Sequence, residues 1–380
     1  MNMMINARCL AGKRTGVGRY LANLLDIWSA NNSGNNYDLY FRNGISDDDF
    51  LDRDGVSSIV VPNSKIFDLG PVWEDIYLPR ALNKDKDADV YFSPTYTLPM
   101  HPLKCKKVVT IFDISYIAHP EWFPFKNRIS LQLLTGSTVK KADVILTGSE
   151  ATKQEILKYY NVDENKIFVT NLGVDKELLS LNECDPSQHI KNVKDKYKLN
   201  GKVILFIGLV MNRRNIPTLM KSVANVIKKT GEKVTLVIIG KNHSFPYFDV
   251  MEEAEKHNIS SSLRWITYTT NEEIFSFYKA ADVFVCSSLY EGFNIPPLEA
   301  MSLGVPVICS NLSSLPEVVG DAAYLLDDPR DLEEMTTAIE AVLFDDKLQK
   351  TLIQKGKDRA DIFSWDKCST ETMKIIENIK

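Results

Sequence analysis

Two glutamates, Glu291 and Glu299, lie on either side of an expected helix start in the segment SLYEGFNIPPLEAMSLGVPVICS, residues 288–310. The short apolar run from Ala281 is typical of a buried parallel strand, and Gly292 allows a sharp turn after it. The N–H groups and the dipole of a helix start can bind a phosphate, whereas carboxylates bind hydroxyl groups. The pattern therefore predicts phosphate on the loop and sugar hydroxyls on the glutamates, which is a nucleotide-sugar site.

Two neighbouring arginines, Arg213 and Arg214, occur in the motif LFIGLVMNRRNIPTLMKSV. We expect a strand to end at Gly208 and a helix to begin near residues 215–217. Guanidinium groups just before a helix start would neutralise a diphosphate and donate to its oxygens in pairs. The alternative is that both arginines are solvated surface residues.

A glycine motif near the N-terminus reads AGKRTGVGRYLANLL and contains Gly16 and Gly18. A dinucleotide-binding fingerprint would need a third small residue at position 21, where Leu21 stands, and this disfavours a dehydrogenase. We expect a loop whose backbone approaches the phosphate or sugar of a ligand. A plain glycine turn is the alternative.

A third candidate, Asp113, follows the apolar run from Val108 and so lies at the carboxyl end of an expected strand. It could contact an acceptor substrate, or it could simply cap a turn or helix. An aromatic cluster follows that could pack in the core or shape an acceptor pocket: His119, Trp122, Phe123 and Phe125. If the acceptor carries a lipid, the last three aromatics could touch a membrane surface together with Lys126, Arg128, Lys140 and Lys141.

The composition is that of an ordinary globular protein, with 380 residues, 44% hydrophobic and 25% charged. This length favours two domains over one. The net charge of -5 argues against nucleic acid as a main partner. No apolar run approaches the roughly 20 residues that span a bilayer, and the N-terminal segment does not resemble a secretory leader. We therefore expect a cytoplasmic protein that at most contacts the inner face of the membrane peripherally.

The cysteines and acidic residues do not predict a metal site. Six cysteines are scattered without a CxxC pair, and reduced structural thiols are the favoured interpretation. The five histidines lack metal-ligand spacing. Acidic runs at 47–49, 52–54 and 85–89 contain Asp-x-Asp spacings but lie away from strand ends, where solvated loops are expected. We predict no catalytic metal and no cofactor, because a nucleotide sugar would be a substrate.

The positions of these motifs follow from an alternation of short apolar runs and helix-like segments, which is typical of α/β units on a parallel sheet. The alternation pauses between residues 175 and 202, and we place a linker near 180–185. Strands are expected at the apolar runs that begin at Tyr37, Ser57, Ala88, Lys107, Ala142, Val203, Val234, Leu263, Asp282, Val305 and Ala322. Two doubly wound domains facing across a cleft are therefore expected, with ligands beyond the carboxyl ends of the strands.

The expected domains are residues 1–180, on the acceptor side, and residues 181–361, on the donor side. The terminal segment FSWDKCSTETMKIIENIK reads as a helix with Trp365 as a packing anchor.

Taken together, these motifs resemble glycosyltransferase family 4, the retaining nucleotide-sugar transferases with the GT-B fold. The resemblance covers essentially the whole chain, and its most specific element is the Glu-x7-Glu motif of Glu291 and Glu299. Arg213 and Arg214 match the family's basic phosphate site, Gly16 and Gly18 match its glycine-rich loop, and SNLSSLPEVVG, residues 310–320, is also similar. The resemblance further implies that the terminal helix, about 362–380, returns to the N-terminal domain.

The resemblance also implies roles for individual residues. Glu299 would take the ribose hydroxyls, and Glu291 would reach hydroxyls of the donor sugar near the reacting carbon. Backbone N–H groups would come from the loop formed by Gly292, Phe293, Asn294 and Ile295. The family often has His-Asp where this chain has Phe112-Asp113, which leaves Asp113 as the acceptor-side candidate.

The function implied is a retaining, metal-independent transfer of a sugar from a nucleoside diphosphate to an acceptor hydroxyl, with Arg214, Glu291 and Asp113 in catalytic positions. The motifs look most like bacterial mannosyltransferases of O-antigen and related surface polysaccharides. GDP-mannose is the favoured donor, and dTDP-rhamnose and UDP-sugars are the alternatives. The acceptor would be a saccharide linked to a lipid such as undecaprenyl diphosphate. A nucleotide-sugar epimerase of the same fold and a non-catalytic nucleotide-sugar binding protein are alternatives from other classes.

Overall fold

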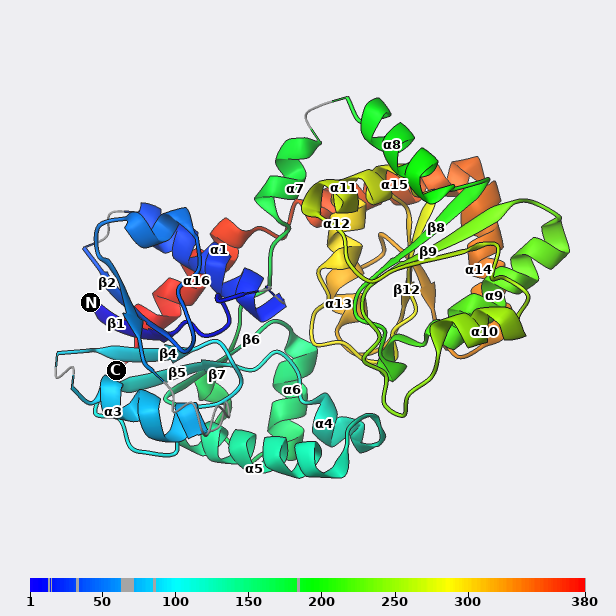
Figure 1. Ribbon diagram of the computed structural model, residues 1–380. Helices are drawn as coiled ribbons and strands as arrows, with labels where there is room; N and C mark the ends of the chain where they lie inside the picture. Colours follow the sequence, from blue (N-terminus) through cyan, green and yellow to red (C-terminus); the bar gives the residue numbers. More distant parts are fainter. Residues whose placement is uncertain are drawn as a thin grey trace. The chain divides into compact units, whose positions relative to one another are not determined.

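The computed structural model describes residues 1–12, 14, 16–31, 34–62, 72–84, 87–182 and 185–379. The chain forms two compact units (Figure 1). Unit 1 contains Met1–Ile117, Lys126–Leu172 and Trp365–Lys380, and unit 2 contains Ala118–Phe125 and Gly173–Ser364. The sequence-based domain boundaries at 180 and 362 thus lie a few residues from the points where the chain changes unit, and the division into domains stays a prediction. Cys184 and parts of the expected linker and of the 85–89 acidic run lie outside the described residues.

Unit 1 is built on a seven-stranded sheet in the order β3-β2-β1-β4-β5-β6-β7, and each neighbouring pair of strands is parallel. The apolar runs form these strands because both faces of the sheet are covered by helices. The strands are β1 (Asn2–Asn6), β2 (Asn36–Phe41), β3 (Val56–Val60), β4 (Val90–Ser93), β5 (Lys106–Thr110), β6 (Val144–Thr147) and β7 (Ile167–Val169).

The helices of unit 1 lie between its strands, with one exception from the end of the chain. The helix α16 packs against α1, where Trp365 is buried beside Tyr20 and the Trp28 indole N–H donates to the Ser369 carbonyl at 3.1 Å. The helical segments are α1 (Gly16–Ala30), η1 (Asp49–Asp52), η2 (Trp73–Tyr77), α3 (Leu78–Leu82), α4 (Ser115–Ala118), α5 (Phe125–Lys141), α6 (Glu150–Tyr159), η4 (Glu164–Lys166) and α16 (Trp365–Glu377). The terminal helix and its Trp365 anchor are as the sequence predicts.

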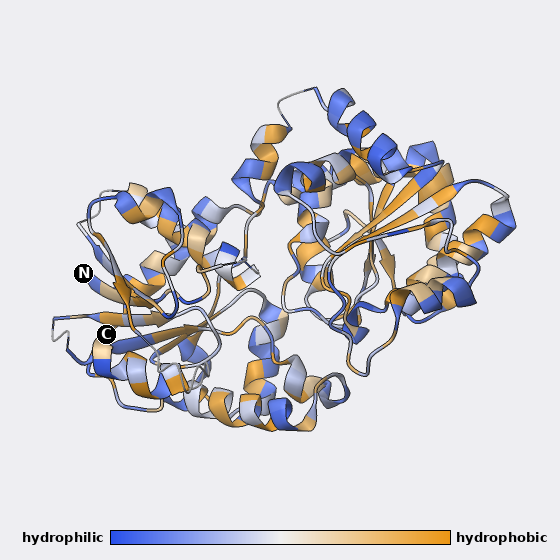
Figure 2. Cartoon of the chain, viewed as in Figure 1, coloured by the Kyte–Doolittle hydropathy of each residue, from blue (hydrophilic) through white to orange (hydrophobic). Residues whose placement is uncertain are grey.

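Unit 2 contains a six-stranded parallel sheet in the order β10-β9-β8-β11-β12-β13. Its central strands consist mostly of hydrophobic residues (Figure 2), and most of these residues are buried. The strands are β8 (Lys202–Ile207), β9 (Val234–Ile239), β10 (Leu263–Ile266), β11 (Val283–Cys286), β12 (Val307–Ser310) and β13 (Tyr324–Leu326).

Several helices of unit 2 bury an apolar stripe. In α9, for example, Leu219, Met220, Val223 and Val226 recur at helical spacing and all are buried. The helical segments are η3 (Pro120–Trp122), α7 (Lys176–Leu181), α8 (Ser187–Tyr197), η5 (Asn212–Arg214), α9 (Ile216–Thr230), α10 (Val250–Lys256), α11 (Asn271–Ala280), α12 (Pro296–Ser302), α13 (Leu315–Val319), α14 (Leu332–Phe344) and α15 (Asp346–Ala360).

The strand orders confirm the predicted fold class, two doubly wound parallel sheets. The order reverses direction between β1 and β4 in unit 1 and between β8 and β11 in unit 2, and such a switch point is where a doubly wound sheet binds its ligand at the carboxyl edge. One local prediction is wrong: Gly16 and Gly18 do not form a loop, because α1 begins at Gly16. None of the described helices is both long and apolar enough to cross a membrane.

Candidate donor site

The first element of the candidate site is the connection from β8 to α9 at the switch point of unit 2. The strand ends before Gly208, whose backbone φ of 146° is strained for any residue with a side chain. A Cβ at Gly208 would lie 3.5 Å from Cζ of Arg214, so the guanidinium lies directly over this glycine. Asn215 immediately precedes α9, and its Nδ2 donates to the Pro329 carbonyl at 2.6 Å.

Arg214 forms an ion pair with Glu291, which follows β11 on the other side of the switch point. The side chains are 12% and 4% exposed, so both charges are largely removed from water. Arg214 Nη1 also donates to Asn294 Oδ1 at 3.2 Å and lies 3.5 Å from Ser288 Oγ. The structure thus brings together Arg214 and Glu291, which the sequence analysis placed in separate motifs.

The Arg214 side chain retains one unused donor. Its Nε is buried and has no hydrogen-bond acceptor among the described residues. Leaving a buried donor of a charged group unpaired costs about 1–3 kcal/mol or more. A ligand oxygen at this position would remove that cost, and a phosphate is the anion whose oxygens a guanidinium pairs with best.

Glu299 occupies the first turn of α12, as the sequence predicts, and is 4% exposed. The Tyr278 hydroxyl on α11 donates to its Oε2 at 2.7 Å, which fixes the carboxylate in one orientation. A carboxylate oxygen has more than one lone pair, so a carboxylate held by one hydroxyl can accept further hydroxyl donors. This is the hydrogen-bonding capacity that a ribose diol requires.

The loop from Gly292 to Ile295 is held at both ends. Ser313 Oγ and Ser314 Oγ donate to the Glu291 carbonyl at 2.7 and 2.8 Å. Asn294 adopts a left-handed φ of 76°, and its Nδ2 donates to Cys286 Sγ at 3.1 Å. Phe293 packs against Phe363 with ring centroids 5.8 Å apart.

The remaining predicted site residues lie outside this cluster. Arg213 is half-buried, and its carbonyl accepts from the Leu289 N–H at 2.7 Å, so its backbone ties the β8 loop to the β11 loop. Gly16 and Gly18 belong to unit 1. A Cβ at Gly18 would clash with the Cys9 carbonyl, so packing within unit 1 accounts for that glycine.

Asp113 also belongs to unit 1 and follows β5 at its carboxyl end. Its Oδ1 accepts from the Ser115 N–H at 3.0 Å and from Ser115 Oγ at 2.6 Å, just before α4. The capping role that the sequence left open is therefore present. In the nearby aromatic cluster, His119 stacks on Trp122 with centroids 4.1 Å apart, whereas Phe125 is 69% exposed.

Sequence reasoning did not identify Tyr278, Ser288, Ser313 or Ser314 as site residues. Tyr278 lies on the buried face of an ordinary amphipathic helix, where an aromatic residue indicates core packing. Ser313 and Ser314 lie in the segment 310–320 that supported the family resemblance. That resemblance was the signal from which these two serines could have been found.

The described cysteines are free thiols. Cys286 and Cys309 face each other in register on β11 and β12, and both are buried. Burial raises the pKa of Cys309 well above its usual value and that of Cys368 to about 12. Within the described ranges, no three His, Cys, Asp or Glu residues form a group that could hold a metal ion.

Two doubly wound parallel sheets in one chain are the architecture of the GT-B glycosyltransferases. Residues 14–178 match the family model "Glycosyltransferase Family 4", and residues 188–359 match "Glycosyl transferases group 1". The O-antigen chain mannosyltransferase B of Escherichia coli is 34% identical over 297 residues, which are 77% of this chain and 75% of that protein. The chain therefore belongs to glycosyltransferase family 4.

Other relatives agree with this assignment. A serotype-specific mannosyltransferase, WbdA of Escherichia coli, is 28% identical over 72% of this chain and 33% of its own length, so the chain spans about a third of that protein. The crystal structure of WaaG, a glycosyltransferase involved in lipopolysaccharide biosynthesis, superposes with a TM-score of 0.77 at 15% identity and full coverage of both chains. Anabaena HepE in complex with UDP and glucose gives 0.76 at 15% identity and 99% coverage of each chain. At such identities these two structures support the fold alone.

Proposed function

We propose that the protein transfers mannose from GDP-mannose to a hydroxyl of a saccharide acceptor with retention of the anomeric configuration. The observation that carries this proposal is the buried Arg214 guanidinium, which is paired with Glu291 and has an unused Nε donor. The mannose donor is supported by the names of the two Escherichia coli relatives. In keeping with the name of the O-antigen chain mannosyltransferase B, the product would belong to an O-antigen type surface polysaccharide.

Arg214 stabilises the leaving diphosphate in this proposal. Negative charge develops on the diphosphate as the glycosidic bond breaks, and a fixed, desolvated guanidinium stabilises such charge strongly. Arg213 supplies a second positive charge from the same loop. Backbone N–H groups of the loop from Gly292 to Ile295 add donors beside the phosphate, and no divalent metal is required for this role.

The two glutamates orient the nucleotide sugar. Glu299, held by Tyr278, accepts the ribose hydroxyls, and Glu291 accepts hydroxyls of the mannose near its reacting carbon. Glu291 exchanges part of its contact with Arg214 for the sugar when the phosphate arrives, because the phosphate then supplies the arginine's counter-charge.

The acceptor hydroxyl attacks from the side on which the diphosphate leaves. An oxygen of the departing phosphate takes the acceptor proton, so the new bond forms on the face from which the old one broke and the configuration is retained. A saccharide linked to a lipid such as undecaprenyl diphosphate is the acceptor that this proposal includes, with peripheral contact at a membrane surface. The aromatic and basic residues from Trp122 to Lys141 are the proposed contact segment.

A panel of nucleotide sugars tests the proposal. The purified protein is incubated with GDP-mannose, UDP-glucose or dTDP-rhamnose, with and without octyl α-D-mannopyranoside, and release of the nucleoside diphosphate is measured. We expect acceptor-dependent release of GDP from GDP-mannose. Conversion of the donor without acceptor would indicate an epimerase, and a thermal shift without any turnover would indicate a binding protein.

A further inference from the structure

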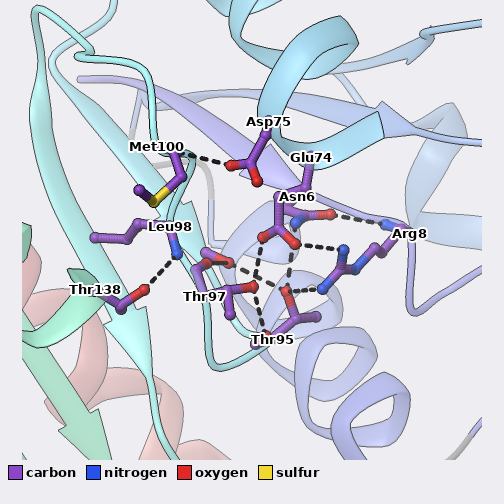
Figure 3. A network of polar contacts seen from close by, with 10 residues as sticks. Asn6, Arg8, Glu74, Asp75, Thr95, Thr97, Leu98, Met100 and Thr138 are labelled. Atoms are coloured by element: carbon purple, nitrogen blue, oxygen red, sulfur yellow. Dashed lines mark hydrogen bonds and ion pairs between the residues drawn. The ribbon is translucent and has the colours of Figure 1, made fainter. Parts of the chain in front are cut away.

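The switch point of unit 1 carries a polar network that the proposed donor chemistry does not use (Figure 3). Arg8 follows β1 and Thr95 follows β4, the two strands between which the order of the sheet reverses. Arg8 Nη2 donates to Thr95 Oγ1 at 3.1 Å, so the contact bridges the carboxyl ends of these strands. Doubly wound sheets bind ligands at this place.

A buried carboxylate anchors the network. Glu74 on η2 is 8% exposed and accepts from Arg8 Nη1 at 2.7 Å and from Thr97 Oγ1 at 2.6 Å (Figure 3). Asn6 Oδ1 accepts from the Arg8 N–H at 3.3 Å. These contacts fix the guanidinium, which uses two of its five N–H donors for Glu74 and Thr95. The Arg8 side chain is still 24% exposed.

Stability alone is a poor explanation for such a network. Removing a guanidinium and a carboxylate from water costs several kcal/mol per ion. A protein with apolar residues of similar volume in place of a buried ion pair is often at least as stable. Unit 2 has the same arrangement at its own switch point, where Arg214 follows the first strand of the sheet and pairs with the buried Glu291. Each unit thus holds an arginine, paired with a buried glutamate, at the switch point of its sheet.

The next residue, Tyr96, connects this network to Asp113. Tyr96 adopts a left-handed φ of 66°, which is rare for a residue with a bulky side chain. Its N–H donates to the Thr110 carbonyl at 3.1 Å, and its hydroxyl lies 3.4 Å from Asp113 Oδ2. The arrangement places a phenol and a carboxylate beside Arg8 along the carboxyl ends of β1, β4 and β5, which are neighbours in the sheet.

We propose that Arg8 and Tyr96, together with Asp113, form the subsite that binds the saccharide acceptor. Arg8 donates to hydroxyl or ring oxygens of the sugar, and the Asp113 carboxylate accepts from a sugar hydroxyl. The Tyr96 side chain restricts the positions that this hydroxyl can take. Glu74 and Thr95 are positioning residues, because they act on the sugar only through Arg8. The inference rests on the proposed function for the identity of the ligand as an acceptor.

The test uses octyl α-D-mannopyranoside as the probe and two conservative variants, Arg8→Lys and Tyr96→Phe. Arg8→Lys keeps the charge but loses the planar pair of donors, so we expect its acceptor KM to rise at least tenfold with the GDP-mannose KM unchanged. Tyr96→Phe should raise the acceptor KM several-fold. Arg53→Lys, at the Arg53–Asp26 surface ion pair of the same unit, is the matched control and should behave as wild type.

Saturation-transfer NMR of the glycoside with each full-length variant gives a second readout that needs no turnover. We expect weaker saturation transfer for Arg8→Lys and Tyr96→Phe than for wild type and Arg53→Lys. Unchanged saturation and unchanged acceptor KM in both variants would overturn the inference, as would an equal rise in the KM of the donor. If Arg8→Lys fails to fold, the acceptor KM and the saturation transfer of Tyr96→Phe decide whether the inference holds. A wild-type protein that binds the glycoside through Arg8 but transfers no mannose would instead contradict the proposed function.

Discussion

Arg214 packs over Gly208, whose φ of 146° disfavours any residue with a side chain, and a Cβ there would be in van der Waals contact with Cζ of Arg214 at 3.5 Å. The contact with Glu291 then orients the guanidinium before a donor arrives. Replacing Arg214 with lysine removes the paired donors and the Nε contact while retaining a charge. We expect turnover to fall by about 10²- to 10³-fold, the loss typical of one preorganised donor to a developing anion.

This first prediction is checked by steady-state kinetics with GDP-mannose and octyl α-D-mannopyranoside. Arg330→Lys, an exposed arginine of the same unit, is the control and should leave turnover unchanged. Near-normal turnover of Arg214→Lys with an intact thermal transition would show that the guanidinium does not contact the leaving group.

The second prediction at this scale concerns Tyr278. Tyr278→Phe removes the hydroxyl that donates to Glu299 Oε2 and leaves the ring packed in the core. Losing one hydrogen bond to a charged group costs about 1.5–3 kcal/mol, part of which water at the site recovers. We expect the donor KM to rise about tenfold with the acceptor KM unchanged, as measured by varying each substrate in turn. A rise in the acceptor KM alone would contradict the proposed contact between Glu299 and the ribose hydroxyls.

Local sequence identified the charged residues of this site but not the partners that hold them. Glu291, Glu299 and Arg214 could be found because each lies directly after a recognisable strand or in a helix start. Tyr278, 21 residues before Glu299 in sequence, meets it only through packing of two helices. Arg8 could have been noticed as a basic residue right after the first strand, but Glu74 could not, because it lies on a separate segment 66 residues away.

At the scale of elements, the loops that follow β8 and β9 approach each other closely at Gly208 and Gly240. Gly240 has a φ of 154°, and a Cβ there would clash with the Gly208 carbonyl. Gly231, after α9, also has a positive φ, of 71°, but a Cβ would meet nothing within 4 Å. We expect Gly231→Ala to cost about 1 kcal/mol from backbone strain alone. Gly240→Ala should cost more than about 3 kcal/mol, because the backbone must also move.

Urea denaturation of the two glycine variants, followed by a probe in unit 2, measures this difference. Equal destabilisation by both substitutions would contradict the close approach of Gly240 to Gly208. Gly240→Ala should also lower the affinity for GDP-mannose. The new Cβ would displace Gly208, and Arg214 packs over Gly208.

The elements themselves were largely predictable, since buried parallel strands are short continuous apolar runs. Each of the apolar runs singled out in the sequence forms a strand. The three-residue β7 was not singled out, because Ile167–Val169 includes an exposed Phe168 and shows no clear pattern. The start of α1 was misplaced because glycine has a low helix propensity, whereas Gly18 lies in the helix, where a side chain would clash with the Cys9 carbonyl.

At the scale of the whole molecule, the C-terminal helix returns to the unit that contains the N-terminus. Trp365 on α16 is 2% exposed and packs against Tyr20, although it follows residues of unit 2 in sequence. Trp365→Ala should cost roughly 3–5 kcal/mol through the cavity that it leaves. Because α16 belongs to unit 1, we expect hydrogen exchange to rise in β1 and β2 and to stay unchanged in β8 and β9.

The control for this prediction is Lys374→Ala, an exposed position on the same helix that should not alter exchange in either unit. Faster exchange in β8 and β9 after Trp365→Ala would contradict the assignment of the helix to unit 1.

The proposed function requires the transfer of mannose with retention of the anomeric configuration. The most direct measurement is NMR of the product formed from GDP-α-D-mannose labelled with ¹³C at C1 and octyl α-D-mannopyranoside. We predict that the label appears in an α-linked disaccharide together with free GDP. A β-linked disaccharide, a converted donor or an unreacted donor would contradict the account.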